Sequence, residues 1–278
     1  TGTSGYGSAL NGSDSNTTTM IGNISTIGYD ADGIVLSASD FNTTILSGGI
    51  TTTGNYANGI ALLRGSDSNT TTMTGNITTT GNIAHGIQAD SSDSNTITMT
   101  GNIATTGTNA YGIFLNTSDG NTTTLTGNIT TTGTSGYGSA LNGSDSNTTT
   151  INGNITTTGV LSMGIIINVS DSNTTTMTGN IITLGDGADG IFINDSSDSN
   201  TINVTGNITT TGNVAAGLEL NASNSNHIAI NGNIITSGTD GDSEPIRFTN
   251  ADSNTITLSG AVHSLGGDQA IAVNSTSQ

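Results

Sequence analysis

Apolar and polar residues alternate over short stretches of the chain, and three such stretches return at intervals of 26 to 28 residues. The first is illustrated by Ile113 and Leu115, the second by Ile97 and Met99, and the third by Ile103, which Thr105 follows two places on. An apolar period of two is typical of strands with one buried face, whereas an amphipathic helix has a period of 3.6. The pattern therefore predicts three short strands in every repeat.

The repeat is marked by the tripeptide Asp-Ser-Asn and its close variants, which begin at positions 14, 40, 67, 93, 119, 145, 171, 198, 224 and 252. Residues 1–19 recur unchanged as residues 132–150, five repeats later. A glycine separates the second and third stretches in each of these repeats, which indicates a corner with φ > 0. Low-complexity disordered sequence has no reason to keep this register, so a stacked repeat structure is favoured.

Stacking pairs each strand in parallel with its copies in the neighbouring coils, about 4.8 Å away. The predicted fold class is all-β, a parallel β-helix (β-solenoid) of about ten to eleven coils, and right-handed winding is the expected hand. We expect residues 1–278 to form one solenoid, with coils starting near residues 7, 33, 59, 86, 112, 138, 164, 190, 217, 245 and 270. Because neither end has a capping sequence, we expect a longer chain or an end-to-end assembly.

An asparagine precedes the second strand in every repeat. In a stack, each carboxamide can donate to one neighbour and accept from the other, which predicts a structural ladder at this corner. Its members are Asn16, Asn42, Asn69, Asn95, Asn121, Asn147, Asn173, Asn200, Asn226 and Asn254.

The charge of the chain narrows the function classes. The sequence has a formal net charge of −18, with 20 acidic and only two basic residues, and 31% of its residues are hydrophobic. Such a chain cannot neutralise phosphates, so we expect no nucleic-acid partner, and no apolar run is long enough for membrane insertion. The absence of cysteine excludes disulfides and thiolate metal sites.

The strings NTTTMTGNITTTGNIAHGI (69–87) and NTITMTGNIATTGTNAYGI (95–113) resemble the β-strand repeats of bacterial autotransporter passenger domains and large parallel β-helix surface adhesins. The resemblance covers nearly the whole chain. It implies a secreted or cell-surface location, and it transfers no catalytic residue. The sequence departs from that pattern in having no translocator barrel or cap, which puts the route of export in doubt.

Catalysis on a β-helix needs acids, bases or cations that converge on one groove, outside the repeat consensus. The three histidines, His85, His227 and His263, occupy different positions of the coil, so they are not expected to meet. Glu219 and Arg247 share an outward slot in consecutive coils, which predicts a surface ion pair with a structural role. We therefore expect that the protein is not an enzyme. Calcium is the one cofactor that the sequence leaves open.

Calcium is considered because acidic residues gather in two places. Aspartate begins nine of the ten marker tripeptides, and this column either caps turn amides or collects divalent cations. The densest cluster consists of Asp240, Asp242 and Glu244, whose alternate carboxylates are ligands that Ca²⁺ prefers. These three residues are the candidate metal ligands.

Two outward faces are candidate contact surfaces. The second strand presents threonine ladders, of the kind that resemble ice-binding proteins, although β-propensity alone also favours threonine there. The first strand and the position before its glycine carry an apolar stripe, and such strips mark contact with a partner. The candidate contact residues are Val35, Phe114, Ile166, Phe192, Tyr111 and Tyr137.

These observations favour a non-enzymatic extracellular structural or adhesive repeat protein, such as a surface stalk, an adhesin passenger or a filament subunit. The alternative is an ice- or polysaccharide-binding solenoid that uses the outward threonine ladders. The expected partners are other copies of the chain, bound end to end or laterally, or glycans and the surfaces of host or neighbouring cells.

Overall fold

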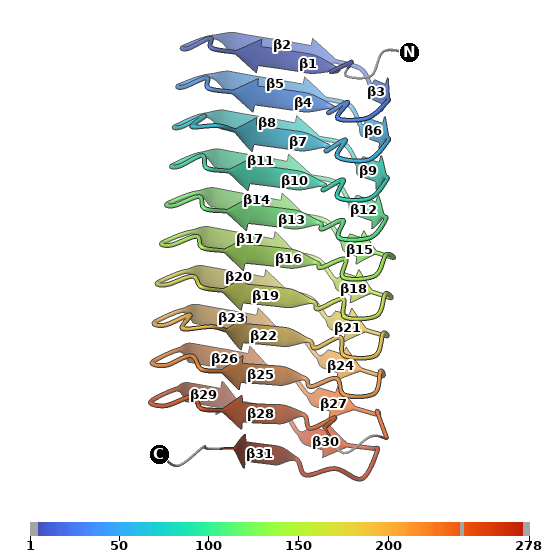
Figure 1. Cartoon of the computed structure of the whole chain (residues 1–278), viewed down its shortest axis with the longest axis vertical. Coiled ribbons are helices and arrows are strands. Elements are labelled where there is room, and N and C mark those ends of the chain that lie inside the picture. Colours follow the sequence, from blue (N-terminus) through green and yellow to red (C-terminus); the bar gives the residue numbers. More distant parts are fainter. Residues whose placement is uncertain (1–4, 240–241, 275–278) are drawn as a thin grey trace.

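The computed structural model describes residues 5–239 and 242–274, which form a stack of similar coils. In that part of the chain 31 strands and no helices are found, and no helix could therefore cross a membrane. The strands belong to three parallel sheets of eleven, ten and ten strands, here named sheets A, B and C. Each of the first ten coils contributes one strand to each sheet, and the strand at residues 271–274 extends sheet A alone, so the sheets run along the stack (Figure 1).

The first strand of each coil belongs to sheet A: β1 (Ser8–Asn11), β4 (Ile34–Ser37), β7 (Ile60–Leu63), β10 (Ile87–Asp90), β13 (Ile113–Asn116), β16 (Ser139–Asn142), β19 (Ile165–Asn168), β22 (Ile191–Asn194), β25 (Leu218–Asn221), β28 (Ile246–Thr249) and β31 (Ile271–Asn274). The second belongs to sheet B: β2 (Thr17–Ile21), β5 (Thr43–Ser47), β8 (Thr70–Thr74), β11 (Thr96–Thr100), β14 (Thr122–Thr126), β17 (Thr148–Asn152), β20 (Thr174–Thr178), β23 (Thr201–Thr205), β26 (His227–Asn231) and β29 (Thr255–Leu258). The third belongs to sheet C: β3 (Ile24–Ile27), β6 (Ile50–Thr53), β9 (Ile77–Thr80), β12 (Ile103–Thr106), β15 (Ile129–Thr131), β18 (Ile155–Thr157), β21 (Ile181–Thr183), β24 (Ile208–Thr210), β27 (Ile234–Thr236) and β30 (Val262–Ser264).

The core is a set of aliphatic columns that run through the middle of the stack. Ile103 pairs in register with Ile77 and Ile129, and each of the three side chains is fully buried. Burial of an isoleucine side chain stabilises the fold by about 1.5–3 kcal/mol, and every interior coil contributes several such residues. The alternation of apolar and polar residues therefore decides which face of each strand points inward.

Close stacking explains the glycine corner. A Cβ atom added to Gly127 would lie 2.0 Å from the carbonyl oxygen of Gly101 in the preceding coil, and Gly127 has φ of +151°. Both constraints admit glycine alone. The corner is thus set by the distance between coils as well as by the turn.

The predicted fold class is confirmed: the chain is an all-β parallel solenoid with coils of about 26 residues and three strands each. Followed from N to C in Figure 1, sheet A strands run in front and sheet B strands return behind while the coils descend, so the winding is right-handed. Continuation into further repeats stays a prediction. The outer surface of sheet A holds the groove described next.

Candidate functional site

The ten asparagines before sheet B lie in one column and join consecutive coils. The main-chain N–H of Asn121 donates to Oδ1 of Asn147 at 2.8 Å, and Nδ2 of Asn147 donates to Oδ1 of Asn173 at 3.2 Å. Asn42 and the other ladder members of the interior coils are at most 1% exposed. This column holds the coils together and is not accessible to a ligand.

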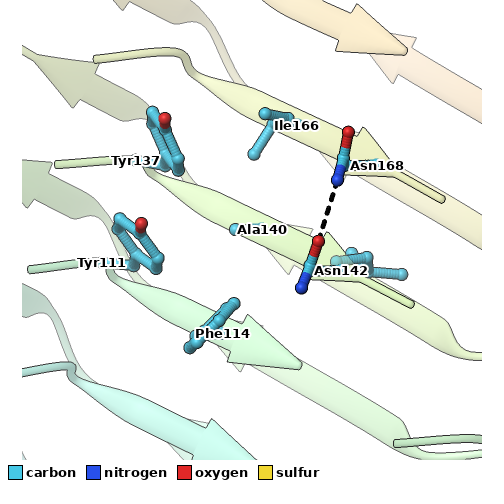
Figure 2. A pocket seen from close by; sticks show the side chains of 8 residues that line it. Tyr111, Phe114, Tyr137, Ala140, Asn142, Ile166 and Asn168 are labelled. Atoms are coloured by element: carbon cyan, nitrogen blue, oxygen red, sulfur yellow. Dashed lines mark hydrogen bonds between the residues drawn. The ribbon is translucent and has the colours of Figure 1, made fainter. Parts of the chain in front are cut away.

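The sheet A groove is a hollow on the outer face of β13, β16 and β19. Its volume is about 370 Å³, and it brings together the aromatic, apolar and amide residues shown in Figure 2. The lining residues are Tyr111, Phe114, Tyr137, Ala140, Leu141, Asn142, Ile166 and Asn168.

Four residues of the predicted contact stripe, Tyr111, Phe114, Tyr137 and Ile166, therefore line one cavity. Phe192 follows in the next coil, where it pairs in register with Ile166 and is half-buried. Val35 departs from the stripe because it is only 5% exposed and lines a separate cavity near Arg64. The open part of the stripe is thus shorter than the sequence pattern suggested.

One wall of the groove is aromatic. The rings of Tyr111 and Tyr137 are stacked, with centroids 4.6 Å apart and an interplanar angle of 16°, and they lie side by side in Figure 2. Phe114 meets Tyr111 edge to face, with centroids 4.9 Å apart. Burial, and then the neighbouring Tyr137, raise the pKa of Tyr111 to about 12, so its phenol stays neutral and can donate a hydrogen bond.

His85 supports this wall from the preceding coil. Its Nδ1 accepts a hydrogen bond from the main-chain N–H of Tyr111 at 3.0 Å, and its ring contacts Tyr111 and Phe114 at centroid distances of 4.8 and 4.9 Å. Burial lowers the pKa of His85 to about 3, so the imidazole is neutral. His85 therefore holds the aromatic rings in place from beneath.

The opposite wall is a second ladder of asparagines at the end of the sheet A strands. Nδ2 of Asn168 donates to Oδ1 of Asn142 at 2.8 Å, and Nδ2 of Asn142 donates to Oδ1 of Asn116 at 2.8 Å. The ladder continues with Nδ2 of Asn194, which donates to Oδ1 of Asn168 at 3.1 Å, and with Nδ2 of Asn221, which donates to Oδ1 of Asn194 at 2.9 Å. Unlike the corner column, this ladder is partly exposed, so its free amide hydrogens and lone pairs are available to a ligand.

Sequence reasoning did not single out this second ladder, although asparagine appears three places after the first-strand isoleucine, as in Ile113 and Asn116. The recurrence was present in the repeat, but a strand-end asparagine is also an ordinary turn residue. Only the stacking of coils shows that these amides face the same groove as the tyrosines.

The floor of the groove exists because one coil has a small residue. Ala140 pairs in register with Phe114 on one side and Ile166 on the other. The two larger side chains rise on either side of the alanine, which is 3% exposed. The step from phenylalanine to alanine to isoleucine creates the hollow.

A charged cluster follows along the same face. Glu219 pairs in register with Phe192 and Arg247, and its Oε2 lies 2.5 Å from Nη2 of Arg247, which confirms the predicted pairing. The pair is not the surface contact expected from the sequence, because its side chains are only 13% and 12% exposed. Burial, and then the Glu219 carboxylate, raise the pKa of the neighbouring Asp189 well above its ordinary value.

The candidate calcium ligands lie at this end of the stack. Asp240 is outside the described residues, Asp242 is exposed, and Glu244 is buried with Oε2 at 3.8 Å from Nη1 of Arg247. The guanidinium also donates to the main-chain oxygen of Asp242 at 2.9 Å. Within residues 5–239 and 242–274, no group of three His, Cys, Asp or Glu residues is arranged to hold a metal ion. A calcium site there stays an untested expectation.

The aspartate column has a capping role between coils. Oδ1 of Asp119 accepts the main-chain N–H of Asp145 at 2.7 Å, and Oδ1 of Asp145 accepts that of Asp171 at 2.7 Å. Each carboxylate thus caps an amide of the following coil, not of its own turn. Asp119, Asp145 and Asp171 are exposed, and each follows a residue of the second asparagine ladder by three positions.

The threonine ladders cover the outer face of sheet B. Thr96, Thr98 and Thr100 pair in register with Thr122, Thr124 and Thr126, so the array contains a third column that the sequence pattern had not singled out. The ten strands of sheet B contain no aspartate, glutamate, lysine or arginine. The array is interrupted at Ile45, Asn203, His227 and Ala229, so the regular threonine face covers only part of sheet B.

The sequence matches no known protein family and no curated protein. Among solved structures, the chain is similar to the autotransporter passenger Vag8, which was determined in complex with C1 inhibitor. The two are 14% identical, the match covers 98% of this chain and 73% of that chain, and the TM-score is 0.40. It is also similar to the A-module of the mannuronan C-5 epimerase AlgE4 of Azotobacter vinelandii, with 12% identity, coverage of 88% and 90%, and a TM-score of 0.32. A third structure, a point mutant of the periplasmic alginate epimerase AlgG, has 10% identity, coverage of 87% and 77%, and a TM-score of 0.22.

These structures are parallel β-helices, and they share with this chain the fold alone. Two of the three are epimerases, which corrects the expectation that the chain is not an enzyme. The physical reason is that the same stacked architecture holds either a plain surface or a catalytic groove, depending on which outward residues deviate from the repeat. Here four ionisable residues converge at sheet A, namely Asp189, Glu219, Glu244 and Arg247. His227 and His263 lie apart from them, on sheets B and C.

Proposed function

We propose that this chain is an extracellular or cell-envelope repeat protein that adheres to an extended carbohydrate along the outer face of sheet A. The observation that carries the proposal is the sheet A groove, which combines aromatic rings with a row of partly exposed amides. A sugar presents apolar C–H faces and hydroxyl edges, and these match ring faces and amide groups respectively. Ligand sites are typically apolar hollows with a few converging polar groups.

The repeat geometry favours a polymer over a single sugar. The second asparagine ladder presents one amide per coil over five coils, from Asn116 to Asn221. Neighbouring coils are about 4.8 Å apart, so these amides extend along roughly 19 Å of the stack. A chain that lies along the solenoid axis can meet the same kind of donor and acceptor repeatedly.

Rigidity of the groove also supports binding. The tyrosine rings are held by stacking and by the buried His85, and the asparagine amides are held by their neighbours in the ladder. A site that is ordered before the ligand arrives loses less conformational entropy on binding. Weak contacts repeated along a rigid rod suit adhesion to a surface.

Calorimetric titration with a panel of soluble oligosaccharides tests the proposal, with Tyr111→Ala and Tyr137→Ala as the site variants. We expect each variant to weaken binding by at least tenfold, because a ring face that covers the sugar is lost. Tyr56→Ala is the matched control, since Tyr56 forms an aromatic pair with Tyr29, is 41% exposed, and does not line the groove. Equal affinity in the wild type and both site variants would contradict the proposal.

Sheet B supports a second candidate function, which is binding to ice. In its middle coils the outer face carries threonines in registered columns, and β-branched side chains hold their hydroxyls in few orientations. Asn152, Asn203, His227 and Ala229 interrupt the columns toward the C-terminal end. Ice-recrystallisation assays would test this with Thr124→Tyr, which interrupts the array, and Thr130→Tyr on sheet C as the control. Activity that both variants retain equally, or no activity in the wild type, would rule this candidate out.

A further inference from the structure

The proposed function leaves open which class of carbohydrate the groove accepts. Resting on that function, we propose that the sheet A groove binds neutral polysaccharides and rejects acidic ones such as polyuronates. The inference concerns the charge of the ligand, and it stands on three features of the described residues: the groove lining, the flanking aspartates and the position of the arginines.

The groove lining has no charge. None of its eight residues is an acid or a base other than the two tyrosines, and burial raises the pKa of both phenols. His85 beneath the aromatic wall is also neutral, because burial lowers its pKa to about 3. A carboxylate that entered this hollow would lose water and meet no cation, which is costly for an ion.

A column of aspartates runs parallel to the asparagine ladder, three residues further along each coil. Asp119, Asp145 and Asp171 each follow a ladder asparagine by three residues, so their main chains lie within about 10 Å of the ladder. All three carboxylates are exposed and repeat once per coil. A polyuronate aligned with the groove would place its own carboxylates beside this row, and the like charges would repel one another within about one Debye length.

Neither arginine of the chain offsets this repulsion. Arg247 is occupied by Glu219, and it also faces Glu244, so it brings no net positive charge to its end of sheet A. Arg64 lines a different cavity together with Asp30 and Asp32. The sequence has no lysine, and its formal net charge is −18. The chain is therefore strongly negative overall, and neither arginine lines the groove.

Matched pairs of hexasaccharides that differ only at C6 provide the test: mannan and mannuronate, glucan and glucuronate, galactan and galacturonate. Affinities are measured calorimetrically at 20 mM and 150 mM NaCl, with EDTA present so that no divalent cation bridges carboxylates. For the sugar type that binds, we expect the neutral member to bind at least tenfold more tightly at 20 mM salt. The difference should shrink at 150 mM, because salt screens the repulsion.

The triple variant Asp119→Asn, Asp145→Asn, Asp171→Asn isolates the cause. Asn224 already occupies this slot in the stack and its Oδ1 accepts the main-chain N–H of Asp252 at 2.7 Å, so the substitution keeps the capping interaction. We expect the variant to bind the uronate member at least threefold more tightly than the wild type does, with the neutral member unchanged.

The outcomes separate the two proposals. A uronate that binds as tightly as its neutral partner, and loses affinity in Tyr111→Ala, would overturn the charge inference and leave carbohydrate binding in place. If no member of any pair binds in a manner that depends on Tyr111 or Tyr137, the proposed function itself is wrong, and the inference falls with it.

Discussion

Three threonines in consecutive coils, Thr123, Thr149 and Thr175, place their hydroxyls inside the core, where they are at most 1% exposed. None of the three Oγ1 atoms has a hydrogen-bond partner among the described residues. The column they occupy on sheet B has isoleucine in the neighbouring coils on both sides, at Ile97 and Ile202. An apolar side chain therefore already fits this slot.

Substitution of each threonine by valine replaces the hydroxyl with a methyl group of similar size. A buried polar group without a partner costs about 1–3 kcal/mol, and a further buried methyl contributes about 0.8 kcal/mol. We expect Thr149→Val to raise the free energy of unfolding by roughly 1–2 kcal/mol. The three sites are adjacent, so their effects add incompletely, and the triple variant should gain roughly 3 kcal/mol and 6–12 °C in Tm.

Urea denaturation and thermal melting, both followed by circular dichroism, measure the change. Thr131→Val is the matched control, because Thr131 is equally buried but its hydroxyl donates to the main-chain oxygen of Gly136 at 2.5 Å. This control should lose about 1 kcal/mol, since the carbonyl is left without its donor. Destabilisation of Thr149→Val to the same extent as Thr131→Val would show that the core hydroxyls are hydrogen-bonded and would refute the reasoning.

Burial raises the pKa of Asp32 to about 7, so protonated Asp32 favours the folded state fully below pH 4, and this contribution is lost as the pH rises through 7. Asp32→Asn introduces the residue that Asn58 supplies in the next coil, and its free energy of unfolding should rise by roughly 2–4 kcal/mol relative to the wild type between pH 4 and pH 8. Parallel curves of Tm against pH would contradict this expectation. Gly127→Ala should lower the free energy of unfolding by about 4 kcal/mol or more, because the added Cβ meets a backbone oxygen. In Gly143→Ala the added Cβ has no neighbour closer than 4.0 Å, so urea denaturation should show a loss of only about 1 kcal/mol. Arg247→Gln leaves the buried carboxylates of Glu219 and Glu244 without a cation, and the free energy of unfolding should fall by about 3 kcal/mol at pH 8 but by less at pH 5. An equal fall at both pH values would argue against this interaction between Arg247 and the two carboxylates.

The candidate site was only partly predictable from the sequence. The positions of Tyr111, Tyr137 and Phe114 in the repeat place them outside the core, and the register between Glu219 and Arg247 follows from counting residues. The approach of Asp189 and Glu244 to Glu219 and Arg247 was not predictable. The irregular spacing of the coil at residues 217–244 hides which side chains meet there. Val35, which occupies the same slot as Phe114, was expected to be open and is covered.

The period, the three strands of each coil, their inward faces and the corner asparagines can all be read from the repeat pattern. These properties repeat in every coil, so a parallel stack is the arrangement that pairs all strands and buries all the aliphatic columns at once. The tertiary structure alone decided what lies on the outside. A hollow arises where Ala140 lies between Phe114 and Ile166. Charge gathers where Asp189, Glu219, Glu244 and Arg247 meet across coils. Such features depend on contacts between non-identical neighbours across coils, and on side-chain size and orientation, which the repeat pattern does not specify.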